Sequence, residues 1–176
     1  MKIQIISAYH SPRLKYAADF ILGQILGFDL LYAQQAETSD EDAIMRIHYG
    51  KGFSCAKVRI PAHPFMESSA IEKPAIQVEK VVGLPAFFFC GEGGEVDLPF
   101  DIFAMSFYLL SRMEEYGAGV QRDEHGRFPA KASLAYQNGF LGQPLIDQWA
   151  WRLYEILRKA YPQCPTRKPN YQLLST

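Results

Sequence analysis

The sequence predicts an α/β domain in which a mixed β-sheet is packed by about three main helices. Three observations lead to this fold class. Short apolar segments typical of strands alternate with a helical segment in the first half of the chain, and two strand-like segments follow each other closely in the middle. Two apolar helical segments then occupy the second half. With 176 residues, of which 48% are hydrophobic and 14% aromatic, the chain can bury the core of one domain.

The first helix is the most clearly marked element of the first half. Ser11 is a preferred N-cap residue, Pro12 suits the first helical position, and Gly27 suits the helix end. The apolar residues between them recur at helical spacing. Around this helix we expect four short strands, within residues 2–9, 28–34, 45–50 and 54–62.

The middle of the chain predicts a strand pair and a tight turn. We expect residues 75–83 and 85–90 to pair as strands that are joined at Gly83, Leu84 and Pro85. The following "GEGGEV", residues 91–96, invites comparison with a nucleotide-binding loop. However, Val96 stands where the dinucleotide fingerprint needs a third glycine, and no phosphate-loop lysine follows. We therefore interpret it as a tight turn ahead of a helix.

Two buried helices are expected in the second half. The first spans about Pro99 to Tyr116 and has little polar surface before its last turn. The second begins near Pro144 and carries Trp149 on an apolar stripe, which places this side chain in the expected core. Between the helices, Asn138-Gly139 is a two-residue turn signal, so we expect a β-hairpin formed by "SLAYQ" and "FLGQP".

The charge and hydropathy patterns disfavour several classes of partner. The 18 Lys and Arg residues nearly balance the 19 Asp and Glu residues, so no basic field would attract nucleic acid or an anionic membrane. The apolar run near the N-terminus is too short for a signal peptide, and no segment approaches the roughly 18 apolar residues of a membrane span. We expect a cytoplasmic protein with no membrane span and no nucleic-acid partner.

No motif indicates a metal, a cofactor or a hydrolase nucleophile. The sequence has no CxxC, HxxxH, HExxH or GxSxG pattern. Cys90 ends an apolar strand and is a conceivable thiol nucleophile, although a packed strand cysteine is the favoured interpretation. We expect no cofactor and no metal site. The residues considered for these roles are Cys55, Cys90, Cys164, His10, His48, His63 and His125.

A polar cluster between the two late helices is the strongest candidate site. Its centre is "RDEHGRFP", residues 122–129. A carboxylate beside a histidine can set the imidazole tautomer for general-base chemistry, and arginines can bind an anionic or sugar substrate. The candidate residues are Arg112, Glu114, Glu115, Tyr116, Asp123, His125, Arg127 and Asp147.

A structural interpretation of the same cluster is favoured over the catalytic one. Asp123 and Gly126 occupy the first and fourth positions of an expected type I turn. Arg112, Glu114 and Glu115 at a helix end can simply bond loop backbone and each other. We therefore expect a turn whose charges are bound to the neighbouring helices.

Several segments resemble the N-terminal region of Bacteroidetes-type polysaccharide deacetylase family proteins. These are "LPFDIFAMSFYLLSRMEEY", "DEHGRFPAKASLAYQNGFL" and "PLIDQW", with "GLPAFF" upstream. The resemblance covers residues 83–151 well and the first 80 residues only as a similar order of strands and helix. In that family an α/β segment of this size precedes the deacetylase domain. The paired aspartates and the HxxxH motif of such a deacetylase are missing here, so the resemblance does not carry its activity to this chain.

The resemblance implies a non-catalytic accessory domain over residues 1–165, followed by an exit linker, residues 166–176, toward a C-terminal deacetylase-like domain of the same protein. Its expected partners are that domain and an oligosaccharide. Exposed aromatic and planar polar side chains would bind the sugar, and the candidates are Tyr116, His125, Arg127, Tyr136 and Trp151.

Two alternatives stay open at this point. The chain could be a small enzyme with His125 as general base, Asp123 or Glu114 orienting it, and Arg112 or Arg127 binding substrate. This alternative requires a pocket in which these side chains converge, with His125 away from an exposed turn tip. The other alternative is a structural spacer without a ligand.

Overall fold

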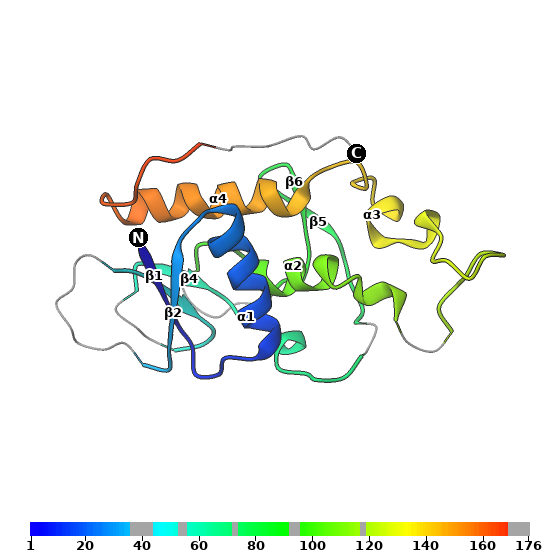
Figure 1. The fold of residues 1–176 in the computed structure, drawn as a ribbon, viewed down its shortest axis with the longest axis horizontal. Helices are drawn as coiled ribbons and strands as arrows, with labels where there is room; N and C mark the ends of the chain where they lie inside the picture. Colours follow the sequence, from blue (N-terminus) through cyan, green and yellow to red (C-terminus); the bar gives the residue numbers. More distant parts are fainter. Residues whose placement is uncertain (36–43, 53–55, 72–73, 92–95, 117–118, 169–176) are drawn as a thin grey trace.

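Four parallel strands form the main sheet, in the spatial order β2-β1-β3-β4. The computed structural model describes residues 1–35, 44–52, 56–71, 74–91, 96–116 and 119–168. Figure 1 shows the sheet at one end of the molecule and α3 at the other. The strands of the two sheets are β1 (Lys2–Ile6), β2 (Asp29–Ala33), β3 (Met45–Tyr49) and β4 (Val58–Ile60), with a separate antiparallel pair of β5 (Glu79–Val81) and β6 (Leu84–Ala86).

The predicted α/β class is confirmed, and the parallel and antiparallel pairings that we expected in one sheet are divided between two. The β5–β6 turn contains Val82 and Gly83 with positive φ angles of 48° and 82°, which is the backbone of a tight two-residue hairpin. Leu84 and Pro85, which we expected in this turn, belong to β6. Strand β6 contacts the last helix, because the Trp149 indole donates a 2.8 Å hydrogen bond to the carbonyl of Pro85. The hairpin thus packs on a helix.

The first helical segment begins as expected. Ser11 Oγ accepts a 3.1 Å hydrogen bond from the amide of Leu14, and Pro12 follows at the first helical position. The segment continues as a π-helix and ends at Gly27, whose φ of 68° favours glycine. The helical elements are α1 (Pro12–Ala18), η1 (Asp19–Ile25), η2 (Pro64–Met66), α2 (Ile102–Leu110), η3 (Met113–Glu115), η4 (Ala130–Ala132), α3 (Leu134–Gln137) and α4 (Leu145–Ala160).

The core lies between one face of the parallel sheet and the helices. Ile5, Ile47 and Val58 are register partners on this face and are completely buried, as are Leu14 of α1 and Phe103 of α2. Burial of an aliphatic side chain of this size contributes about 1.5–3 kcal/mol. Trp149 is 1% exposed, which confirms its predicted place in the core.

The helix expected over Pro99 to Tyr116 is shorter at both ends. It begins at Ile102 because the Asp101 carboxylate caps its first amides. It ends at Leu110, and Arg112 follows in a left-handed conformation with a φ of 51°.

The hairpin predicted around Asn138-Gly139 is wrong. "LAYQ" forms helix α3, which is capped by the Ser133 hydroxyl, because this group accepts a 3.1 Å hydrogen bond from the amide of Tyr136. Gly139 has a φ of 72°, and the amide of Phe140 donates to the carbonyl of Ala135 at 2.9 Å. These are the features of a Schellman helix end, which needs the same left-handed glycine as a tight hairpin.

The C-terminal part that is described packs against the body. Tyr154 donates a 2.7 Å hydrogen bond to the carbonyl of Pro165, and the Arg167 guanidinium donates to the carbonyl of Leu26 beside Gly27. Of the predicted linker, residues 169–176 lie outside the described residues, as do residues 92–95 of the predicted glycine-rich turn. Across the described residues, no helix has the length and hydropathy needed to cross a membrane.

Candidate functional site

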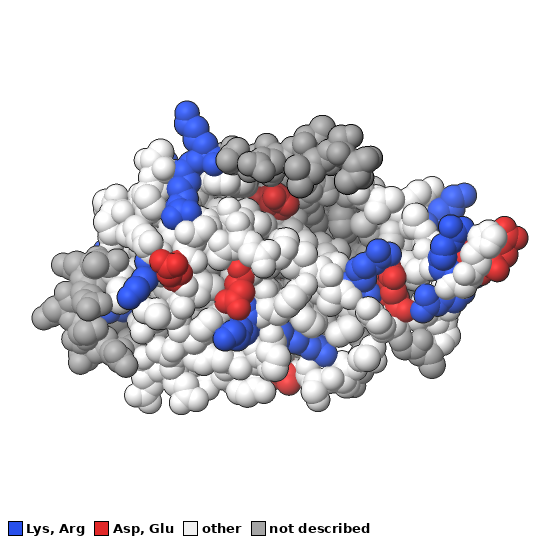
Figure 2. All heavy atoms as spheres, in the orientation of Figure 1, with Lys and Arg blue, Asp and Glu red and all other residues white. Residues whose placement is uncertain are grey.

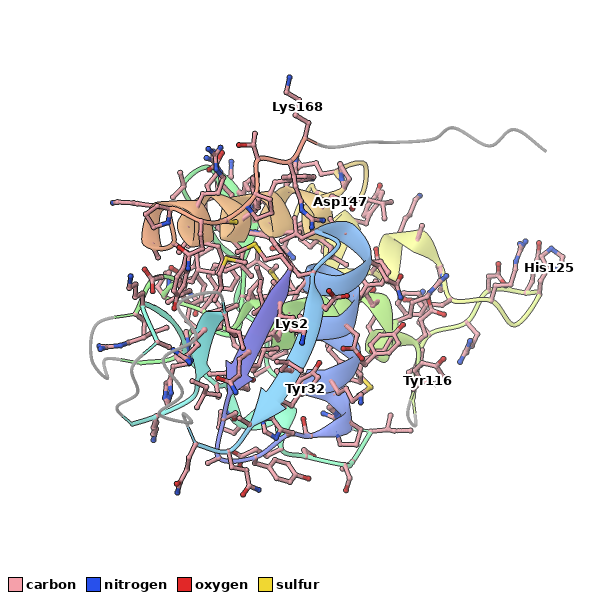
Figure 3. The ribbon with its side chains drawn as sticks, turned by 60° about the vertical axis from the view of Figure 1, so that its left-hand side comes forward. Lys2, Tyr32, Tyr116, His125, Asp147 and Lys168 are labelled. Atoms are coloured by element: carbon pink, nitrogen blue, oxygen red, sulfur yellow. The ribbon has the colours of Figure 1, made fainter. Side chains whose placement is uncertain are left out.

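The segment 122–129 contains the turn that the sequence predicts. The amide of Gly126 donates to the carbonyl of Asp123 at 2.9 Å. The Asp123 carboxylate accepts hydrogen bonds from the amides of His125 (2.9 Å) and Arg127 (2.8 Å), and from Arg127 Nε at 3.0 Å. The hydrogen bonds, that of the Arg127 amide above all, hold the pKa of Asp123 below its ordinary value. The His125 side chain is 62% exposed and lies at the far tip of the loop (Figure 3).

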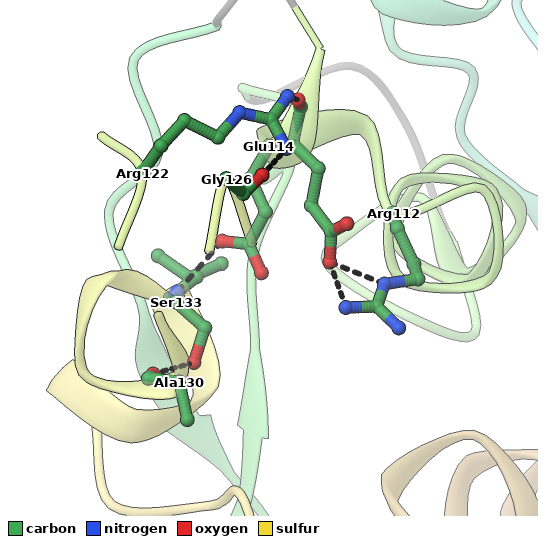
Figure 4. A network of polar contacts seen from close by, with 8 residues as sticks. Arg112, Glu114, Arg122, Gly126, Ala130 and Ser133 are labelled. Atoms are coloured by element: carbon green, nitrogen blue, oxygen red, sulfur yellow. Dashed lines mark hydrogen bonds and ion pairs between the residues drawn. The ribbon is translucent and has the colours of Figure 1, made fainter. Parts of the chain in front are cut away.

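A second group of contacts ties the base of this loop to its neighbours (Figure 4). Arg112 forms an ion pair with Glu115, and Arg122 donates to the carbonyl of Glu115 at 2.9 Å. The Glu114 carboxylate accepts a 2.7 Å hydrogen bond from the amide of Leu134, at the start of α3. Charged groups of both signs gather at this end of the molecule (Figure 2). These contacts give the charges structural partners.

The predicted cluster therefore does not meet at one point. Arg112, Glu114 and Glu115 lie at the base of the loop, and Asp123, His125 and Arg127 lie in the turn. Asp147 belongs to the first turn of α4 and borders a separate groove, and Tyr116 is exposed (Figure 3). The enzyme alternative requires His125 to lie away from an exposed turn tip, and the structure places it at such a tip.

A different site lies at the carboxyl ends of the parallel strands. The chain passes from β1 to β2 on one side and then to β3 on the other side of β1, so the strand order reverses between β1 and β3. Segments that leave the sheet at such a point diverge and open a crevice. A pocket of about 360 Å³ lies here, and its lining includes Ser7, Tyr9, Tyr49, Lys51, Met66 and Glu67.

Hydroxyl groups and an aromatic ring form the wall that follows β1. Ser7 Oγ donates to the carbonyl of Tyr9 at 3.0 Å and accepts from the Tyr9 amide at 3.4 Å. This local pair holds the bend after the strand, because a serine hydroxyl can bond backbone two residues away. Tyr9 is 56% exposed, so its ring is accessible to a ligand.

Tyr49 extends from the end of β3 to a buried carboxylate. Its hydroxyl donates to Asp101 Oδ2 at 2.6 Å, and the same oxygen accepts from the amide of His63 at 2.8 Å. The other oxygen accepts from the amides of Phe103 and Ala104, both at 2.9 Å. Burial raises the pKa of Asp101 to about 6, although these four donors favour the ionised form. Burial, and then the Asp101 charge, raises the pKa of Tyr49, so the phenol remains a donor.

The thiol of Cys90 is affected by the same charges. Burial and the Asp101 carboxylate raise the pKa of Cys90 to about 11, against a smaller opposing effect of Lys51. The thiol donates to the carbonyl of Phe88 at 3.6 Å. A thiol with a raised pKa is a poor nucleophile at neutral pH, which favours the packed-cysteine interpretation.

Phe88 adopts an unusual backbone conformation close to this network. Its φ of 65° is sparsely populated by bulky residues, and the surrounding packing must maintain it. Its ring lies 4.8 Å from that of His63 and 4.9 Å from that of Phe65. Its carbonyl accepts a 3.0 Å hydrogen bond from the amide of Asp101. The strained residue thus helps to position the helix-capping carboxylate.

Within the described residues, no three His, Cys, Asp or Glu side chains are grouped so that they could hold a metal ion. The groups in the pocket that can contact a ligand are hydroxyl groups, an aromatic ring and two charged side chains.

Sequence reasoning missed the pocket because it extended the first strand to residue 9. The strand ends at Ile6, so Ser7 and Tyr9 belong to the crevice and not to the sheet. The available signal was the polar "SAYHSP" between a strand and a helix N-cap, together with "YGKG" after another strand of the same parallel set.

The fold and the pocket together define an α/β domain with a ligand-sized crevice at its sheet edge. The chain belongs to the family of unknown function named DUF7033, whose model matches residues 3–162. Neither the curated proteins nor the solved structures that were compared with the chain contain a match.

Proposed function

We propose that this chain is a non-catalytic accessory domain of a polysaccharide deacetylase-like protein and that it binds an oligosaccharide in the sheet-edge pocket. The observation that carries the sugar-binding part is the position of the pocket, at the reversal of the strand order in a parallel sheet. The association with a deacetylase is supported by the resemblance of residues 83–151 to the N-terminal region of such proteins.

The pocket has the chemistry that sugar binding needs. A sugar ring presents an apolar face, which packs on an aromatic ring, and a rim of hydroxyl groups, which need donors and acceptors. Tyr9 offers an exposed ring, and Ser7, Lys51 and Glu67 offer polar groups around it. The volume of about 360 Å³ suits a small ligand or a few units of a longer one.

Calorimetric titration of the protein with a panel of neutral and amino-sugar oligosaccharides measures binding affinity and tests this proposal. We expect Tyr9→Ala to weaken binding about tenfold, because loss of one aromatic contact costs about 1.4 kcal/mol. Tyr116→Ala is the matched control, since Tyr116 is exposed to the same extent, 56%, but does not line the pocket. The absence of binding by every sugar would overturn the proposal. A loss of affinity in Tyr116→Ala and not in Tyr9→Ala would show that the sugar binds at the loop predicted from the sequence.

A second candidate function is docking on the deacetylase-like domain of the same protein. A groove of about 220 Å³ lies between α2, α3 and α4, and its lining includes Leu109, Phe140 and Ile146. Leu141, which also lines the groove, is 53% exposed, and the whole groove falls within the segment that carries the resemblance. In a protein containing both domains, Leu141→Asp is expected to uncouple their thermal unfolding. Unchanged coupling would exclude this surface.

A further inference from the structure

The sheet-edge pocket carries opposite charges on two of its walls. Lys51 follows β3 and Glu67 follows η2, and both side chains line the pocket and are exposed. In the part of the chain that the structure describes, neither side chain belongs to an ion pair. Each charge is therefore available to a ligand.

The backbone that presents Glu67 is held in place before any ligand binds. Arg13 donates to the carbonyls of Phe65 at 2.6 Å and Ala70 at 2.7 Å, on either side of Glu67. The amide of Glu67 donates to the carbonyl of Pro64 at 3.0 Å. A preorganised loop lowers the entropy cost of binding.

Other charged and titratable groups near Glu67 make its side of the pocket suitable for a cation. Burial and the Asp101 carboxylate are the main causes of the raised pKa of Tyr49, and the charge of Glu67, which lines the same pocket, adds the smallest contribution. Below the floor lies the Asp101 carboxyl group, which is about half ionised at pH 6 because burial raises its pKa to about 6. The Arg13 guanidinium lies over the rings of Phe65 and Phe107 and does not line the pocket.

We infer that the pocket prefers a ligand with a protonated amine beside Glu67 and uncharged oxygen atoms beside Lys51. Applied to the proposed function, on which this inference rests, the ligand is an oligosaccharide of amino sugars whose amines are free and not acetylated. A protonated amine forms a charge-assisted hydrogen bond with Glu67, about twice as strong as one from a neutral amide. An acetylated nitrogen lacks the charge and adds bulk, and sugar hydroxyls can accept from Lys51.

The test compares two oligosaccharides of equal length, a glucosamine oligomer and its fully N-acetylated counterpart. At about pH 6, a carboxylate of ordinary pKa is mostly ionised and an amine mostly protonated. We expect the free-amine oligomer to bind about tenfold more tightly, and added salt to reduce this preference. We expect Glu67→Gln to remove the preference and Glu67→Asp to keep part of it. Glu79→Gln, an exposed glutamate on β5, is the control and should change neither affinity.

The outcomes separate this inference from the function on which it rests. Equal affinity for the two oligomers, or a preference that survives in Glu67→Gln, overturns amine selection while sugar binding stands. Tighter binding of a uronic-acid oligomer that is lost in Lys51→Met also overturns it, because the ligand charge would then be negative. Failure of every oligosaccharide to bind overturns both proposals.

Discussion

Two aspartates, one in the exposed turn and one below the pocket, show how similar hydrogen bonding leads to opposite electrostatics. Asp123 accepts from the amides of His125 and Arg127, and Asp101 accepts from those of Phe103 and Ala104. The pKa of Asp123 is lowered, whereas that of Asp101 is raised to about 6. The two pKa values differ because Asp101 is fully buried and lacks contact with solvent. The effect of burial on the pKa of Asp101 outweighs that of the four hydrogen-bond donors.

The largest expected effect is that of Asp101→Ala. The substitution removes a helix cap and leaves the Tyr49 hydroxyl and the His63 amide without their acceptor. We expect the free energy of unfolding to fall by about 3 kcal/mol or more. Urea denaturation measures this loss, with Asp123→Ala as the partly exposed counterpart. Equal losses in the two variants would contradict the role given to burial.

The pH dependence of stability should differ in sign at the two sites. The folded-state pKa of Asp101 is about 6 against an ordinary 3.8, so the folded protein binds more protons between these values. The contribution of Asp101 to the free energy of unfolding therefore decreases as the pH rises from 3.8 to about 6. The decrease is about 3 kcal/mol, because one pKa unit corresponds to about 1.4 kcal/mol. The lowered pKa of Asp123 acts oppositely, because its stabilisation is present above 3.8 and is lost as the pH falls through the folded-state pKa.

Urea denaturation between about pH 4 and pH 7 tests this sign. We expect Asp101→Asn to be less stable than the parent at low pH and to approach it as the pH rises, since asparagine does not titrate. A constant difference across the range would show that Asp101 keeps an ordinary pKa.

A smaller effect is expected from removing one donor to each carboxylate. Tyr49→Phe deletes a hydrogen bond that favours ionised Asp101, so the pKa of Asp101 should rise further and the stability should fall by about 1 kcal/mol. Arg127→Ala should raise the pKa of Asp123 toward its ordinary value. Carboxyl NMR titrations follow both groups. A fall in the pKa of Asp101 in Tyr49→Phe would contradict this account.

The smallest effect is expected from His125→Ala. The side chain is exposed, and its only described contact is the 3.4 Å pair with Glu124. We expect the free energy of unfolding to change by no more than about 0.5 kcal/mol, as is usual for surface substitutions. Thermal denaturation of the variant and the parent measures this change. A larger change would indicate that the turn tip has a packing role that its exposure does not suggest.

The same contrast shows which features could be predicted from the sequence. Ser11, Pro12 and the stripe around Trp149 were interpreted correctly because the signals for a helix start and an amphipathic helix are local. The hairpin prediction at Asn138-Gly139 is wrong because a left-handed glycine is typical of helix ends as well as of tight hairpins, and the Ser133 cap is the signal that favours the helix.

The candidate site was harder to predict than the fold class. The charges of the turn around Asp123 are adjacent in sequence, so they indicate a candidate site, but the same pattern is typical of a solvated loop. Asp101 stands alone among apolar residues, and its partners Tyr49 and His63 lie 52 and 38 positions away. The pairing of β3 with β4 brings Tyr49 near His63, and the packing of α2 adds Asp101, so the group depends on contacts between distant segments.

The close approach of Arg167 to Gly27 has a consequence for the evolution of the chain. A methyl group added at Gly27 would overlap the Arg167 guanidinium, which donates to the neighbouring carbonyl of Leu26 and lies over the ring of Phe28. The two positions are thus in contact across almost the whole chain. A substitution at Gly27 must both adopt a φ of 68° and displace the flexible end of Arg167, so relatives should vary more readily at position 167 than at position 27.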